Sequence, residues 1–213
     1  PYKKLLNALL RRIDREKVSI IKEQDAAKLN TPDWLWNSWV NAYGEIATRK
    51  IALAHMKVPT IDISVKSNIT EWAKKLEGAV LPTGSIRLRS SSNITAIDGF
   101  NQGEWWVQDA AARLPSTLFT NDLKGSLIAD ICAAPGGKTA QLINSGANVV
   151  AVDRSKARLK ILNENLSRLS YEAKIICTDA TKWKPDNLFD GVLLDAPCSS
   201  TGTIRRHPDV KYL

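Results

Sequence analysis

Residues 126–139 read Ser-Leu-Ile-Ala-Asp-Ile-Cys-Ala-Ala-Pro-Gly-Gly-Lys-Thr, and this stretch decides the fold. Its first part is a short apolar run typical of a buried strand, and its adjacent glycines open a helix predicted over residues 136–144. Glycines at such a turn let the backbone approach a ligand closely, and the first N–H groups of the helix have no partner within it. The stretch therefore predicts a strand, a ligand-binding turn and a helix in succession.

The same alternation of strand and helix continues along the chain. Strands are predicted over residues 148–153, 174–177 and 189–195, with a long helix over residues 155–169. Short apolar strands that alternate with helices indicate a parallel sheet covered on both faces. Ligands of such sheets bind beyond the carboxyl ends of the strands, where the strand order reverses. We therefore predict an α/β protein with a Rossmann-like parallel sheet in residues 104–213, and a ligand site at that edge.

Two further regions precede this sheet. In residues 1–58, leucines recur at helical spacing as far as residue 29, and Asn30-Thr31-Pro32 predicts a cap residue followed by proline in the first turn of a second helix. The second helix carries a bulky apolar stripe, for which we expect packing rather than base stacking: Leu35, Trp36, Trp39, Tyr43 and Ile46.

Residues 59–103 read as a small α/β module. Alternation over residues 61–65 predicts a strand, and a short helix is predicted over residues 70–77. Residues 85–89 and 93–97 are β-like. A further helix, which ends at Leu118, is expected to lead from this module into the parallel sheet.

Composition narrows the class of protein further. The 213 residues are 44% hydrophobic and 24% charged, which excludes disordered, collagen-like and coiled-coil chains. The sequence has no apolar run of about 18 residues and no signal peptide, and its three cysteines form no disulfide framework. We expect a cytoplasmic monomer with no metal site and no membrane segment.

The net charge is +8, and residues 1–58 hold 11 basic and 6 acidic side chains, which indicates either a nucleic-acid partner or a solvated helix face.

Acidic residues follow successive predicted strands. Asp153 closes the second strand about 20 residues after the glycine turn, where a carboxylate can bind both hydroxyls of a ribose. Asp179 follows the third strand, within reach of the amino group of an adenine ring. Each of these residues alone could instead be a helix cap. With Asp130 at the end of the first strand, they make three strand-end acidic groups around the glycine turn, and this order predicts a nucleoside pocket.

A phosphate-binding P-loop is the competing interpretation of the glycine turn. Gly137-Lys138-Thr139 matches the end of the pattern G-x-x-x-x-G-K-[ST]. However, Cys132 stands where the first glycine of that pattern belongs, and Pro135 stiffens the segment that should wrap the phosphates. The sequence therefore disfavours a nucleotide triphosphatase.

The fourth strand leads into Asp195-Ala196-Pro197-Cys198 and a loop rich in serine and glycine. A thiol that follows an acid and a proline in such a loop is expected to be exposed and reactive. By contrast, Cys177 lies inside an apolar strand and is expected in the core.

Four segments resemble successive motifs of the RNA 5-methylcytosine methyltransferases: DICAAPGGKT (130–139), AVDRS (151–155), CTDAT (177–181) and DAPCSSTGTIRRHPD (195–209). The last segment is most similar to the bacterial Sun/Fmu group of RsmB type, which methylates 16S ribosomal RNA. Upstream, residues 6–12 resemble the last helix of the family's NusB-like RNA-binding domain, and residues 59–103 would correspond to its small linker domain.

The resemblance implies a cofactor and a substrate. The cofactor is S-adenosyl-L-methionine, with Asp153 on its ribose, Asp179 on its adenine and Asp195 at its methionine end. The loop that would hold it comprises Cys132, Ala133, Ala134, Pro135, Gly136, Gly137 and Lys138. The implied partner is small-subunit ribosomal RNA, whose target base must be unstacked to be reached.

The family's chemistry also assigns catalytic roles. A thiolate adds to carbon 6 of cytosine, so that carbon 5 can take the methyl group before a base removes its proton and the thiolate leaves. Asp195 would support the addition at the N3 edge, and Cys198 would assist product release. The attacking thiol comes from a later T-C motif that this sequence lacks, so we expect it to be part of a longer protein and not to turn over by itself. A catalytically incomplete RNA-binding module, or a related methyltransferase with another RNA target, remain alternatives.

Overall fold

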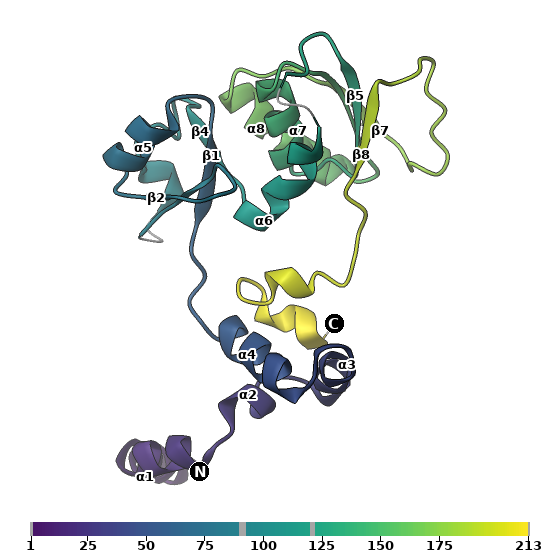
Figure 1. Ribbon diagram of the computed structural model, residues 1–213. Coiled ribbons are helices and arrows are strands. Elements are labelled where there is room, and N and C mark those ends of the chain that lie inside the picture. The colour runs from purple at the N-terminus through teal and green to yellow at the C-terminus, as the bar shows by residue number, and fades with distance from the viewer. Residues whose placement is uncertain (1, 90–92, 120–121, 213) are drawn as a thin grey trace. The chain divides into compact units, whose positions relative to one another are not determined.

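The computed structural model describes residues 2–89, 93–119 and 122–212, which form two compact units (Figure 1). The sheet unit comprises residues 60–198, and the helical unit comprises the residues up to 59 together with residues 199–212. In these described ranges, no helix combines the length and the apolar character needed to cross a membrane.

The sheet unit contains a parallel sheet with the strand order β7-β6-β5-β8. Its strands are β5 (Leu127–Ile131), β6 (Asn148–Asp153), β7 (Lys174–Cys177) and β8 (Gly191–Leu194). The chain builds outward from β5 to β6 and β7, then returns to place β8 on the other side of β5. The predicted Rossmann-like parallel sheet is thus confirmed, and its strand order reverses between β5 and β8.

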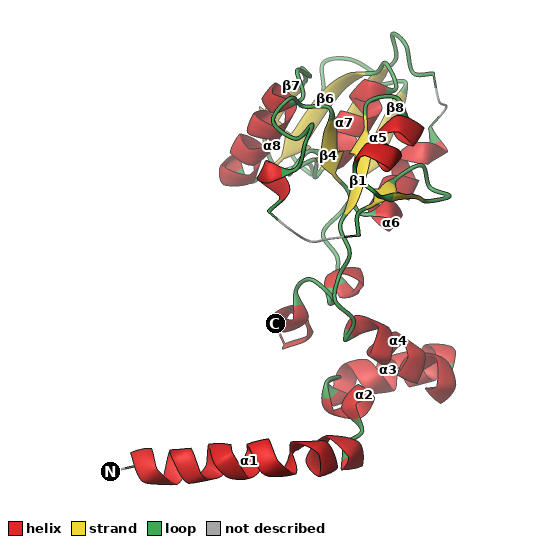
Figure 2. Ribbon diagram, turned by 90° about the vertical axis from the view of Figure 1, so that its left-hand side faces the viewer, coloured by secondary structure: helices red, strands yellow, loops and turns green. Residues whose placement is uncertain are grey.

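Two helices lie against this sheet (Figure 2): α7 (Gly137–Asn144) and α8 (Lys156–Arg168). Leu159, Leu162 and Leu166 recur at helical spacing on α8 and are buried in the core. On the opposite face of the sheet, Trp183 and Phe189 pack against alternate residues of β5 and β6. The period-two alternation of the strands explains why one strand supplies both cores.

The sheet unit also contains an antiparallel sheet, with the order β2-β3-β1-β4. Its elements are β1 (Asp62–Val65), α5 (Ile69–Lys75), β2 (Ala79–Val80), β3 (Ile86–Arg87) and β4 (Trp105–Val107). Its core includes Ile63, Ile86 and Trp105, which are fully buried. The prediction of β-like structure over residues 93–97 was wrong, since Asn93 accepts a hydrogen bond from the N–H of Thr95 and starts the short 3-10 helix η1 (Ile94–Ala96).

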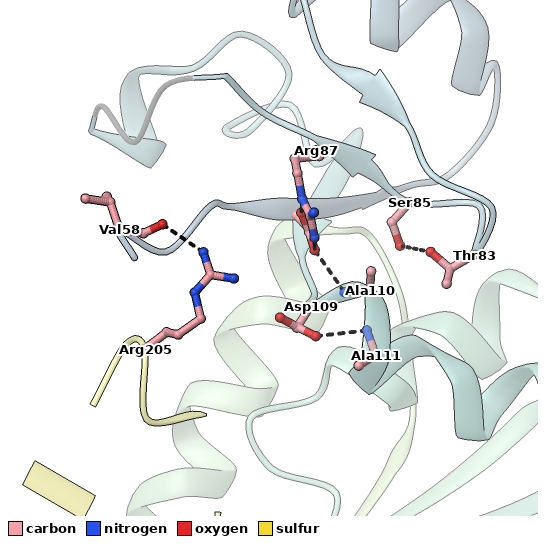
Figure 3. A network of polar contacts seen from close by, with 9 residues as sticks. Val58, Thr83, Ser85, Arg87, Asp109, Ala110, Ala111 and Arg205 are labelled. Carbon is pink, nitrogen blue, oxygen red and sulfur yellow. Dashed lines mark hydrogen bonds and ion pairs between the residues drawn. The ribbon is translucent and has the colours of Figure 1, made fainter. Parts of the chain in front are cut away.

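The antiparallel sheet continues beyond residue 103, which is the predicted end of the small module. β4 pairs with β1 along three residues, Trp105 to Val107. The buried carboxylate of Asp62 on β1 accepts two hydrogen bonds from Arg87, at 2.7 and 2.9 Å, and one from the N–H of Ala110. Figure 3 labels the two donor residues, Arg87 and Ala110. This carboxylate therefore connects the antiparallel sheet to the helix that follows β4.

That helix is shorter than predicted. The α-helix α6 (Ala110–Arg113) gives way to the 3-10 helix η2 (Leu114–Leu118), which has Pro115 in its first turn. Proline has no N–H to donate to the preceding turn and its ring displaces the carbonyl there, so the α-helix ends before it.

The helical unit contains α1 (Lys3–Glu23), α2 (Ala26–Leu29), α3 (Asp33–Tyr43) and α4 (Glu45–His55), with the 3-10 helices η3 (Thr201–Thr203) and η4 (Pro208–Tyr212). No residue of α1 is buried. The C-terminal segment packs on this unit, because Ile204 is buried, Arg205 donates to the carbonyl of Val58 (Figure 3) and Lys211 donates to that of Asn30.

Three predictions for this unit need correction. The first helix breaks at Asp25, which caps α2. Thr31 does not cap the next helix, since its hydroxyl donates to the carbonyl of Ala27 and Pro32 occupies the cap position. Within the predicted stripe, Leu35 and Trp36 are buried, but Tyr43 and Ile46 are 63% and 78% exposed because Gly44, at φ +77°, separates α3 from α4.

Candidate functional site

A cavity of about 560 Å³ opens in the sheet unit at the point where the strand order reverses. Its walls are the loop after β5 together with the first residues of α7 (residues 132–138), Asp195 after β8, and residues 106–109 at the end of β4. Asn165, Arg168 and Phe100 also line it. Reversal points of this kind are where parallel α/β sheets bind their ligands.

The loop after β5 has an unusual backbone. Cys132 and Gly136 adopt left-handed conformations, with φ +62° and +101°, and the Ala134–Pro135 peptide bond is cis. A Cβ at Gly136 would also lie 3.0 Å from Cγ of Leu162, so both the conformation and the packing require glycine there.

Gly137 has a different reason to lack a side chain. Its φ is not positive, and a Cβ there would meet no atom closer than 3.9 Å, from Gln108. Because Gly137, Gln108 and Val107 all line the cavity, a side chain at position 137 would occupy part of the space that a ligand could use.

Asp130 is one of the predicted strand-end acidic groups around the glycine turn, although no ligand contact was predicted for it. Its carboxylate is fully buried and lines the cavity. Its Oδ2 accepts a hydrogen bond of 2.6 Å from the hydroxyl of Thr139, while its Oδ1 has no hydrogen-bond partner among the described residues. Burial raises the pKa of Asp130 to about 6, against the opposing effect of the Thr139 hydrogen bond. A buried carboxylate with an unused oxygen suits a cationic group of a ligand.

Across the cavity, Lys138 Nζ forms an ion pair of 2.6 Å with Oδ2 of Asp195. The Lys138 side chain is only 14% exposed, whereas that of Asp195 is 54% exposed. This pair joins the start of α7 to the end of β8, and both of its members line the cavity.

Asp153 lies beside the loop and not among the residues that line the cavity. Its Oδ2 accepts a hydrogen bond of 3.3 Å from the N–H of Ala134, and its Oδ1 accepts one of 2.9 Å from the N–H of Ser155. Arg158 NH1 is 3.7 Å from Oδ2 of Asp153. In this structure, the carboxylate connects the glycine turn to the start of α8.

Asp179 and Cys198 are exposed, and neither lines the cavity. Asp179 Oδ1 accepts hydrogen bonds from the hydroxyl and the N–H of Thr181, and these bonds lower its pKa. The structure thus brings residues 132–138 and Asp195 together in one cavity and leaves Asp153, Asp179 and Cys198 outside it. The roles assigned to these three residues stay predictions.

The remaining cysteines differ in environment. Burial, followed by the nearby Asp153 and Asp195, raises the pKa of the Cys132 thiol, which keeps it protonated at neutral pH. The expectation that Cys177 lies in the core was wrong, because it ends the edge strand β7 and is exposed, with its Sγ 3.8 Å from the carbonyl oxygen of Arg154.

This fold, with a glycine turn after the first strand of the parallel sheet and the cavity at its reversal point, is that of a class I methyltransferase domain. Two solved structures share it at similar levels of identity. "Crystal Structure of PH0851" matches with a TM-score of 0.78 and 27% identity, over 89% of this chain and 47% of that one. A methyltransferase homolog protein from Pyrococcus horikoshii matches with a TM-score of 0.60 and 28% identity, over 80% and 61%. NSun6 from Pyrococcus horikoshii with SFG, at 18% identity and a TM-score of 0.63, shares the fold.

Residues 118–213 match the model of the family described as 16S rRNA methyltransferase RsmB/F. "Ribosomal RNA small subunit methyltransferase B" of Vibrio vulnificus is 38% identical over 98% of this chain and 53% of its own length. The protein of the same name from Pasteurella multocida is 36% identical over 100% and 51%. These matches confirm the resemblance found in the sequence, and the chain spans about half the length of these relatives.

Proposed function

We propose that this protein methylates carbon 5 of a cytosine in small-subunit ribosomal RNA, with S-adenosylmethionine as the methyl donor. The observation that carries the proposal is the cavity at the reversal point, in which the start of α7, the free oxygen of Asp130 and the Lys138–Asp195 ion pair converge.

The charges around this cavity fit the cofactor. S-Adenosylmethionine carries a carboxylate at one end beside an ammonium group, with a sulfonium nearby. The N-terminus of α7 attracts an anion through its free N–H groups and its dipole. Asp130 offers an acceptor to a cation, and Gly137 leaves room for a close approach of the ligand to the backbone.

When bound, the cofactor supplies an electrophilic methyl group. In the proposed reaction Asp153 and Asp179, which follow neighbouring strands of the sheet, bind its ribose and its adenine. Asp195 contacts the N3 edge of the target cytosine from its place at the cavity wall. Cys198, three residues further along and exposed, assists release of the methylated base. The RNA itself docks through the cationic residues 1–58, which hold 11 basic and 6 acidic side chains.

The test combines product mapping with one variant and its control. The full-length protein is incubated with S-adenosylmethionine and 16S ribosomal RNA, and bisulfite treatment then locates any cytosine that has become resistant to conversion. We expect one resistant site, and its absence would contradict methylation at carbon 5.

Cys198→Ala in the same protein should trap a covalent protein–RNA adduct that is visible on a denaturing gel. Cys177→Ala is the matched control, since this thiol is also exposed but lies at the end of β7. Turnover by Cys198→Ala at the wild-type rate without an adduct would contradict the release role.

A further inference from the structure

The helix α8 makes a set of contacts with the glycine turn that the proposed chemistry leaves unused. Arg158 NH2 donates a hydrogen bond to the carbonyl of Ala134. One turn further along, Leu162 packs against Gly136, and after it Asn165 Nδ2 donates to the carbonyl of Pro135 at 3.0 Å. The three side chains share one face of α8, because residues three and four positions apart are neighbours on a helix.

These contacts complete the pairing of the loop's carbonyl groups. The carbonyl of Ala133 accepts the N–H of Gly136, that of Gly136 accepts the N–H of Ala140, and that of Gly137 accepts the indole N–H of Trp106. With Arg158 and Asn165, every carbonyl from residue 133 to residue 137 has a donor.

The direction of these carbonyl groups matters for binding. A peptide carbonyl that pointed at the ligand would repel a carboxylate, whereas N–H groups attract it. The first N–H groups of α7 have no partner within the helix and so remain available to a ligand. Carbonyl groups held against α8 therefore favour a loop that presents its donors to the cavity.

We propose that Arg158 and Asn165 are positioning residues for the cofactor, which hold the carbonyl groups of Ala134 and Pro135 against α8 and so set the binding conformation of the loop. Arg158 acts on a second group as well, because it also lies 3.7 Å from the Asp153 carboxylate. This inference rests on the proposed function, since it takes S-adenosylmethionine as the ligand.

Asn165→Asp tests the hydrogen bond itself. A carboxylate has the shape of the amide but cannot donate to the Pro135 carbonyl, so we expect affinity for S-adenosylmethionine at pH 8 to fall about fivefold. The protonated acid can donate again, so affinity should recover towards the wild-type value as the pH is lowered through about 4, where an aspartic acid takes up its proton. Titration calorimetry on the full-length protein measures both values, with wild type measured at each pH. Asn163→Asp is the matched control, since Asn163 is exposed on the same helix and should change affinity at neither pH.

Substitutions of Arg158 provide an independent test of the inference. Arg158→Gln should weaken binding about tenfold and Arg158→Lys less, because lysine keeps the charge without the fork of donors. Lys160→Gln, at an exposed position of the same helix, is its control. Equal affinities of wild type and Asn165→Asp at pH 8, or a loss that low pH does not reverse, would overturn the inference. The inference would also be overturned if affinity fell only in variants whose free energy of unfolding in urea fell as well. Wild-type protein that binds no S-adenosylmethionine would instead overturn the proposed function, and this inference with it.

Discussion

Substitution of Asp130 by asparagine should change how the stability of the protein depends on pH. The carboxylate is fully buried, and burial raises its pKa from 3.8 to about 6. Between these two values the folded protein binds the proton more tightly than the unfolded chain does. The stabilisation from the protonated acid is thus complete below pH 3.8 and is lost as the pH rises through 6.

The size of the effect follows from the shift. A rise of about 2 pKa units corresponds to about 3 kcal/mol of unfolding free energy, of which about 2 kcal/mol is lost between pH 4.5 and 7.5. The amide of the variant would not titrate, and its oxygen can still accept the hydroxyl of Thr139. The unfolding free energy of Asp130→Asn minus that of wild type should therefore become about 2 kcal/mol more positive over this range, whatever its value at pH 4.5.

Urea unfolding of both proteins at a series of pH values, followed by circular dichroism, measures this difference. The same measurement with saturating S-adenosylmethionine is a second test. An ammonium group beside Asp130 would stabilise the carboxylate and so reduce the dependence of the unfolding free energy on pH. A difference that stays constant within about 0.5 kcal/mol from pH 4.5 to 7.5 would refute the reasoning, since surface substitutions change stability by no more than this.

Arg87→Ala should lower the free energy of unfolding by about 3 kcal/mol in urea, because the buried Asp62 carboxylate loses its bidentate partner; a loss below about 1 kcal/mol would contradict this. Gly136→Ala should destabilise the protein by about 2 kcal/mol, whereas Gly137→Ala should leave stability within about 0.5 kcal/mol and still weaken S-adenosylmethionine binding. Unchanged affinity of Gly137→Ala in calorimetry would show that the ligand does not approach this position. The logarithm of the binding constant for 16S ribosomal RNA should fall linearly with the logarithm of salt concentration, and a flat response in filter binding would argue against docking through residues 1–58.

Much of the sheet could be predicted because its signals are local. The apolar runs over residues 126–130 and 148–153 have the length of buried strands, and the glycines after the first run mark the turn. The cavity wall formed by residues 132–138 was predictable for the same reason. Asp195 was added from the resemblance of residues 195–209 to a family motif, and in the structure it directly follows β8, which pairs with β5.

The failures have a common cause in competing local hydrogen bonds and in tertiary contacts. Thr31 and Asn93 both suit helix caps, but only Asn93 uses its side chain in this way, since the hydroxyl of Thr31 donates to the preceding helix. Such choices between two partners of similar energy depend on the surrounding packing and not on the residue type.

Asp130 was counted among the strand-end acidic groups, but no contact with the cofactor was predicted for it. It lies within the apolar run that predicts β5, where a carboxylate normally marks only the strand end. A charged residue inside a buried strand is itself an informative signal. Burying a carboxylate without a full set of hydrogen-bond partners costs free energy, and such a group is typical of a site where a ligand supplies the missing partner.

The pairing of β4 with β1 has a consequence for exchanging parts between relatives. The antiparallel sheet takes its edge strand from residues 105–107, and the segment that leaves this strand walls the cavity up to residue 109. In a chimaera joined between residues 103 and 104, β4 would come from one parent and the rest of the antiparallel sheet from the other. Residues 106–109, which line the cavity, would then pair with a β1 strand from a different protein. A graft that begins at residue 60 would carry strand, wall and support together, so recombination between homologues should tolerate a crossover there far better than one at residue 103.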